Sequence, residues 1–97
     1  MWKAAYNVIA AFPTEPEAAT HARRALVWGA FHVQGAPVFA PIDGVDHEIR
    51  TYRFLTEGQR RLFKARVAKA LVGTSVTVEM EDESDRIWVP DKQRSKS

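Results

Sequence analysis

The side chains best suited to catalysis or metal binding are three histidines and a short group of acids. His21, His32 and His47 lie far apart and show none of the short spacings that ligate zinc. In an extended segment, neighbouring side chains point to opposite faces, which would split the directions of the last histidine and the acids near it. The chain has no cysteine, which excludes thiolate metal ligands and cysteine nucleophiles. We predict no metal and no cofactor. The acids beside this histidine are Asp43, Asp46 and Glu48.

The segment from Arg50 to Leu55 carries residue types that bind nucleic acid. It reads basic, any, aromatic, any, aromatic, aliphatic, which resembles the signature of the RNA recognition motif. In that family the two aromatic rings stack on bases, and an aromatic on the first strand, here Tyr6, would complete the platform. Basic residues of the following helix would contact phosphates. The candidate nucleic-acid-binding residues are Arg50, Tyr52, Phe54, Arg60, Arg61 and Lys64.

The same segment also has a structural interpretation. Tyr52 and Phe54 are core residues if their side chains face the helices, and the alternation of the first segment sends Tyr6 inward. Thr51 stands where RNA recognition motifs carry a glycine. The cations of the following helix fan around it, which is typical of a solvated face. The direction of the two aromatic side chains therefore decides between RNA binding and core packing.

A run of acids near the end of the chain is a third candidate site. Its spacing does not match a calcium loop, so a solvated turn or a contact with a basic protein surface remains. Trp88 follows this run, and tryptophan is a frequent anchor of protein interfaces. The candidate protein-binding residues are Glu79, Glu81, Asp82, Glu83, Asp85 and Trp88.

Hydrophobic periodicity predicts four strands and two helices that would position these residues. Thr14 and Thr56 each precede a glutamate or glutamine by three residues, which indicates helix capping boxes. Asp43-Gly44 predicts a two-residue hairpin. A short fifth strand, Arg86 to Val89, is expected after an acidic turn over 81–85. The four main strands are expected at Trp2 to Phe12, Phe31 to Ile42, Val45 to about Leu55 and Ser75 to Met80, with the helices between Thr14 and Gly29 and between Thr56 and Gly73.

The predicted order β-α-β-β-α-β resembles the ferredoxin-like superfold over roughly Trp2 to Met80. The resemblance implies an α+β sandwich, with an antiparallel four-stranded sheet and both helices on one face. Because this superfold has many functions, it does not select one. A small dimeric ferredoxin-like enzyme is one alternative, in which Asn7, Trp28 and His47 would line a pocket between helices and sheet.

Because no spacing in the sequence matches a catalytic motif, we predict a non-enzymatic binding protein, an inhibitor, adaptor or regulator. The 97 residues, 45% hydrophobic and 27% charged, fit one globular domain over 1–90, with a polar tail over 91–97 that we expect to be disordered. The net charge of +2 is small, and no apolar stretch could span a membrane, so we expect a cytoplasmic protein. We predict a protein partner, with nucleic acid as the alternative and a homodimer compatible with the open sheet. Accessory proteins of phages and mobile elements, including anti-CRISPR inhibitors of host defence, are similar in kind.

Overall fold

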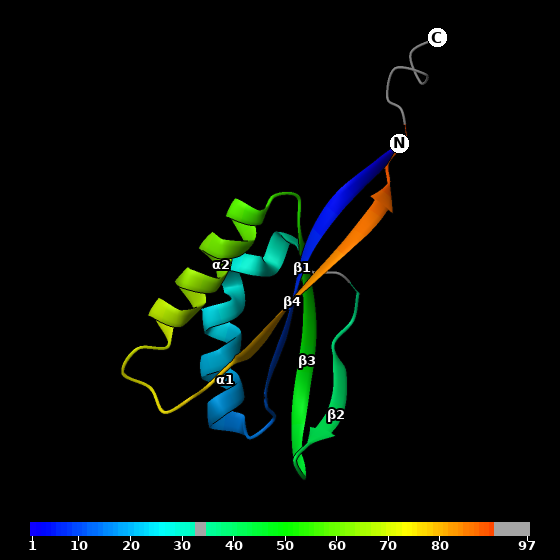
Figure 1. The fold of residues 1–97 in the computed structure, drawn as a ribbon. Helices are drawn as coiled ribbons and strands as arrows, with labels where there is room; N and C mark the ends of the chain where they lie inside the picture. The colour runs from blue at the N-terminus through cyan, green and yellow to red at the C-terminus, as the bar shows by residue number, and fades with distance from the viewer. Residues whose placement is uncertain (33–34, 91–97) are drawn as a thin grey trace.

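The computed structural model describes residues 1–32 and 35–90, which form one sheet and a helical layer (Figure 1). The predicted tail over 91–97 lies outside the described residues. The elements, in chain order, are β1 (Trp2–Pro13), α1 (Pro16–Ala25), the 3-10 helix η1 (Leu26–His32), β2 (Val38–Ile42), β3 (Val45–Phe54), α2 (Glu57–Ala70) and β4 (Glu79–Trp88).

The sheet has the strand order β2-β3-β1-β4, and each neighbouring pair is antiparallel. Both α-helices lie on the same side of it (Figure 1). This combination of element order, strand order and layers confirms the predicted α+β, ferredoxin-like fold. No helix among residues 1–32 and 35–90 is both long and apolar enough to cross a membrane.

The hydrophobic core lies between the helices and the even-numbered face of β1. Val8, Ala10 and Phe12 of that face are fully buried against the helical layer, because alternate side chains of a strand share one face. From α1, three alanines contribute to the core, so this helix packs closely on the sheet. From α2, Phe63 and Val67 contribute.

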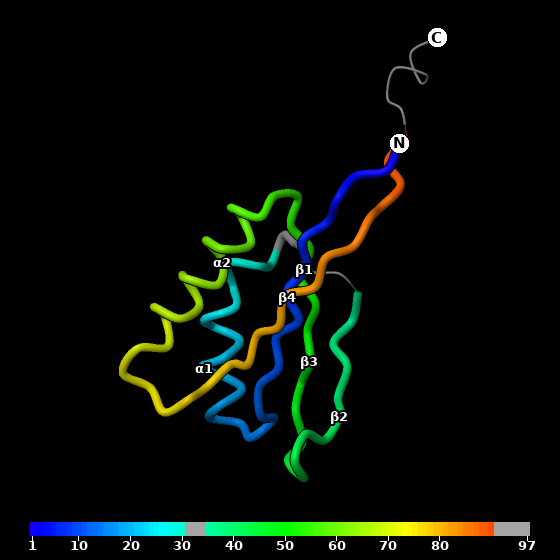
Figure 2. Tube along the Cα trace, in the orientation of Figure 1, coloured from blue at the N-terminus to red at the C-terminus, as the bar shows by residue number. Residues whose placement is uncertain are grey.

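One end of the sheet continues beyond the helices as a two-stranded arm. β3 pairs with β1 only as far as Tyr6, whereas β4 continues to the pair Trp2–Trp88. The ammonium of Met1 donates to the carbonyl of Val89 at 2.9 Å, and the Val89 N–H donates back to the Met1 carbonyl at 2.8 Å. Figure 2 shows the N-terminus and the end of β4 side by side at the tip of this arm.

The turns and caps agree in part with the sequence patterns. The hairpin between β2 and β3 is confirmed, with φ of 51° at Asp43 and 78° at Gly44. Thr56 caps α2 by accepting a hydrogen bond from the Gln59 N–H at 3.1 Å. The prediction that Thr14 caps α1 is wrong. Glu15 is the cap, because α1 begins at Pro16, the residue after it. The Glu15 carboxylate accepts hydrogen bonds from the backbone N–H groups of Glu17 and Ala18.

Several predicted strand boundaries are wrong. The fourth strand was expected to begin at Ser75, but β4 begins at Glu79. The segment from Phe31 was assigned to the second strand, but the chain continues from α1 into η1, and β2 begins at Val38. The predicted acidic turn and fifth strand do not exist as such. The whole stretch from Glu79 to Trp88 is one strand, paired without interruption with β1. Its continuous backbone pairing outweighs the low strand propensity of aspartate and glutamate.

Candidate functional site

The aromatic side chains of the RNA-binding prediction lie in the core. Tyr52 is fully buried and Phe54 is 2% exposed. Both rings pack against Phe63 of α2, with centroid separations of 5.0 and 5.1 Å. Even-numbered residues of β3 face the helices, so neither ring can stack on a base. The predicted stacking platform is therefore wrong, and the alternative, that these aromatics are core residues, is confirmed.

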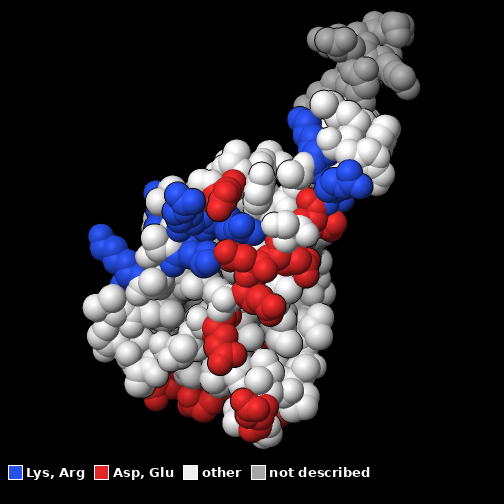
Figure 3. All heavy atoms as spheres, in the orientation of Figure 1, with Lys and Arg blue, Asp and Glu red and all other residues white. Residues whose placement is uncertain are grey.

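The basic residues predicted to contact phosphates are mostly engaged within the chain. Arg60 is 8% exposed and donates to the carbonyls of Asn7 at 3.5 Å and Glu83 at 3.4 Å. Lys64 donates to both carboxylate oxygens of Asp82, at 2.9 and 3.1 Å. Arg61 pairs with a glutamate one helical turn away. Figure 3 shows these cations of α2 beside the acids of β4, so the two charged runs partly neutralise each other.

The acids of the third candidate site form a ladder along the edge of the sheet. β4 is the outermost strand of the described sheet, and its acidic side chains are exposed or half-exposed. Alternation divides them between two faces. Asp82 lies on the helical side, within reach of Lys64 and Arg60. The acids on the open face, opposite the helices, are Glu79, Glu81, Glu83 and Asp85.

A buried asparagine connects the upper half of this ladder to the sheet. Asn7 is 2% exposed although it lies on the open face. Its side-chain NH2 group donates to the Glu83 carboxylate at 3.4 Å, and its side-chain oxygen Oδ1 accepts from Arg53 Nε at 3.3 Å. Arg53 also pairs with Asp85 at 3.7 Å. The sequence patterns did not predict this network, although a polar residue at position 7 within an apolar strand is a signal for it.

The lower half of the ladder has a different environment. Among the residues that the structure describes, no cation pairs with Glu79 or Glu81. These two acids border a shallow open-face cleft of about 320 Å³. The floor of this cleft is apolar and contains Ile9, Ala11 and Ile49. The open face therefore combines an apolar surface with two unpaired carboxylates.

Trp88 lies on the arm, as far along β4 as the strand extends. Its ring packs edge-on against Trp2, with centroids 5.6 Å apart, and Arg86 lies over Trp2 at 5.6 Å. The two tryptophans remain 59% and 61% exposed. A pair of large exposed aromatic rings beside an arginine has the composition of an interface anchor.

The residues imagined for an enzyme pocket do not come together. Asn7 and His47 are both on the open face, but His47 pairs with Pro13 at the opposite end of β1. Trp28 lies in η1, where Arg66 covers its ring at 4.6 Å. The three side chains therefore do not share a pocket.

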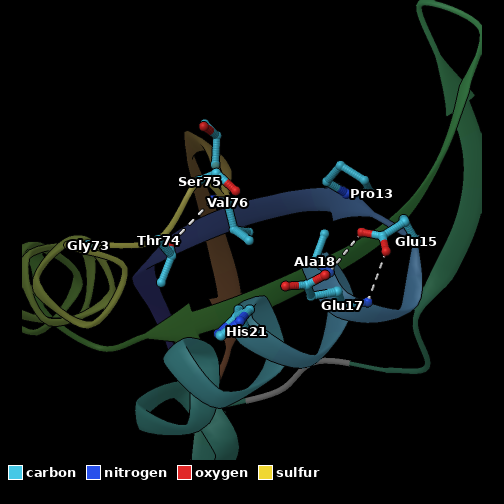
Figure 4. A pocket seen from close by; sticks show the side chains of 10 residues that line it. Pro13, Glu15, Glu17, Ala18, His21, Gly73, Thr74, Ser75 and Val76 are labelled. Carbon is cyan, nitrogen blue, oxygen red and sulfur yellow. Dashed lines mark hydrogen bonds between the residues drawn. The ribbon is translucent and has the colours of Figure 1, made fainter.

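A cleft of about 660 Å³ lies between the start of α1 and the loop that precedes β4. Figure 4 shows His21 facing Thr74 and Val76 across this opening. The Glu15 carboxylate is occupied as the helix cap, and the Thr74 hydroxyl donates to the Leu71 carbonyl at 2.8 Å. Among the described residues that line the cleft, no hydroxyl is hydrogen-bonded to His21.

A buried ion cluster lies under the helical layer. Glu48 is 1% exposed and accepts from Arg23 at 2.6 Å and from Arg50. Burial raises the pKa of Glu48, but the hydrogen bonds from these two arginines outweigh it and hold the pKa below its ordinary value. Tyr52 lies nearby, and its buried hydroxyl has no hydrogen-bond partner in the described structure. Burial raises the pKa of this hydroxyl, and the neighbouring Arg50 guanidinium offsets part of the increase.

Within residues 1–32 and 35–90, no group of three or more histidines or acids could hold a metal ion. No protein-family model matches the chain, and no curated protein matches it closely enough to count as a relative. One solved structure, an uncharacterized protein from Thermotoga maritima, is similar with a TM-score of 0.49 and 10% sequence identity. The match covers 84% of this chain and 98% of that one. The fold assignment rests on the strand order and layers described above.

Proposed function

We propose that this protein is a non-enzymatic binding protein that acts through protein–protein contacts, as an inhibitor, adaptor or regulator. The observation that carries the proposal is the position of the acidic ladder. All of its side chains lie on the outermost strand β4, where an incoming surface can reach them. Charged groups at such a position attract and orient a partner of opposite charge. The partner surface is therefore basic.

Trp2 and Trp88 continue the β4 edge beyond the acids, although alternation places both rings on the helical side and not on the open face. They lie at the end of β4 that is farthest from Glu79. A partner that lies along the strand therefore contacts carboxylates at one end and aromatic rings at the other. Large rings supply binding energy by burial, whereas exposed carboxylates mainly supply specificity and association rate. The two features together support a protein partner. Nucleic acid, whose phosphates the acids would repel, is disfavoured at this edge.

The test is a pull-down from a lysate of the source organism, with and without nuclease. We expect the intact chain to capture a protein whose recovery does not change after nuclease treatment. Replacing Glu79→Lys and Glu81→Lys together should abolish this capture. The matched control replaces Glu17→Lys and Glu57→Lys, two exposed acids on the helices, which gives the same change of net charge. Equal loss in both double variants, or capture that depends on nucleic acid, would contradict the proposal.

A further inference from the structure

The backbone of β4 offers hydrogen-bonding groups at its outer edge. Met1 and Val89 exchange both of their backbone hydrogen bonds, so the odd-numbered residues of β4 point their N–H and C=O groups toward β1. The even-numbered residues therefore point theirs outward. At Arg86 the outward N–H is already bound by the Asp85 carboxylate at 2.7 Å. The outward groups of Met80, Asp82 and Ser84 face an edge without another strand of the described sheet.

The charges of β4 disfavour pairing with a second copy of the same strand. Antiparallel pairing about Asp82 would place Glu81 opposite Glu83 and Glu79 opposite Asp85. These are the positions where opposed side chains approach most closely, because they are not hydrogen-bonded pairs. Like charges directly opposite each other destabilise a strand pair. Shifting either strand by two residues again brings acids face to face, so the edge resists self-association.

The same ladder favours an extended segment of opposite charge. We infer that β4 binds an extended basic polypeptide segment of a partner protein, which adds to the sheet as an antiparallel fifth strand and carries lysine or arginine at every second position. This inference rests on the proposed function and specifies its partner. Cations two residues apart would lie opposite Glu79, Glu81, Glu83 and Asp85 on the open face, with outward backbone groups paired at the positions between them.

The environment of each acid predicts where the basic segment is held most strongly. Glu83 and Asp85 already interact with Asn7 and Arg53, whereas Glu79 and Glu81 have no cation partner in the described structure. A partner cation therefore gains most at the lower half of the ladder. The apolar floor beside these two acids accommodates the aliphatic part of a long basic side chain, whose charged end reaches a carboxylate.

Four synthetic peptides of equal length and equal amino-acid content test strand addition on the full chain. In the first, lysines alternate with valine or threonine, and in the second the lysines are in one block. The third is the alternating peptide with N-methyl groups on the backbone amides that would face β4. We expect the alternating peptide to bind at least tenfold more tightly than the block peptide and the third, methylated peptide. A fourth peptide, methylated on the opposite edge, should keep the affinity of the first.

Amide hydrogen exchange supplies an independent readout. Saturation with the alternating peptide should slow exchange at Met80, Asp82 and Ser84 at least tenfold, while the amide of Arg86 changes less because Asp85 already binds it. If the alternating and block peptides bind equally and methylation has no effect, strand addition is wrong, although an acid-dependent partner in the pull-down would still support the proposed function. If these amides are protected in the free chain and lose protection when 91–97 are removed, the chain itself occupies the edge and the inference is also wrong.

Discussion

The backbone of Gly29 lies directly against the ring of Tyr52. A Cβ atom placed on this glycine would be 2.5 Å from Tyr52 Cδ1 and 2.8 Å from Phe63 Cε1. Because both rings are buried, neither can move aside cheaply. We expect Gly29→Ala to lower the free energy of unfolding by about 1–3 kcal/mol in urea denaturation. Gly58→Ala is the control, since its nearest neighbour is 3.9 Å away and alanine favours a helix. Equal stability of both variants would contradict this packing.

Tyr52 separates the core interpretation from the RNA-binding interpretation. We expect Tyr52→Ala to lower the free energy of unfolding by about 3–5 kcal/mol, because it leaves a cavity beneath the helices. Tyr52→Phe removes only the hydroxyl, and we expect it to change the free energy by no more than about 1 kcal/mol, because this buried group gains little beyond its neighbour Arg50. Thermal and denaturant unfolding measure both. A Tyr52→Ala variant as stable as the original chain would place this ring outside the core.

Arg60 and Arg61 are neighbours in sequence with opposite roles. Arg60 binds two backbone carbonyls and lies over the Tyr6 ring at 5.3 Å, whereas Arg61 is exposed beside Glu57. We expect Arg60→Ala to lower the free energy of unfolding by about 2 kcal/mol, because a nearly buried side chain loses both its packing and its charged hydrogen bonds to the two carbonyls. Arg61→Ala should change it by no more than about 0.5 kcal/mol. Similar values for the two variants would show that Arg60 is not structural.

Glu48 makes the stability of the fold depend on acidity. Its pKa in the folded protein lies below its ordinary value of 4.5, so the folded chain binds fewer protons than the unfolded chain. The stabilisation from Glu48 is therefore present above about pH 4.5 and is lost as pH falls through the lower, folded pKa. We expect the stability difference between the original chain and Glu48→Gln to shrink on acidification. Urea unfolding at several pH values measures this difference, with Glu17→Gln as the exposed control. Parallel profiles of unfolding free energy against pH for the original chain and Glu48→Gln would contradict the prediction.

Trp2 and Trp88 should stabilise the arm through each other. A double-mutant cycle with Trp2→Ala and Trp88→Ala should give a coupling energy of about 0.5–1.5 kcal/mol, as expected for an edge-on aromatic pair. Each single change should cost little beyond this coupling energy, because both rings are mostly exposed. Trp88→Ala combined with Val72→Ala, at the other end of the molecule, should show no coupling. Strictly additive effects of the two tryptophan changes would mean that the rings do not interact in solution.

The sequence predicted those elements whose local signals agree with their tertiary environment. Asp43-Gly44 and Thr56 mark a turn and a cap by their own backbone preferences, so the hairpin and the start of α2 were correct. The acidic segment of β4 was misread because its strand conformation comes from pairing with β1, which is distant in sequence. Alternation alone could not settle the direction of Tyr52. It places Arg53 on one face of β3 and the two aromatic side chains on the other, but it does not say which face the helices cover. That choice depends on where α2 places Phe63.

The contact between Met1 and Val89 makes the described chain almost a closed ring. Since the two backbones exchange hydrogen bonds at the tip of the arm, a short glycine-rich linker could join them without bending either strand. New ends could then be opened at the Asp43-Gly44 turn or near Gly73, both of which are exposed. Such circular permutants would move the points of attachment away from the tryptophan pair and leave the β4 edge in place. A label or solid support could thus be joined to either end of the molecule's long axis.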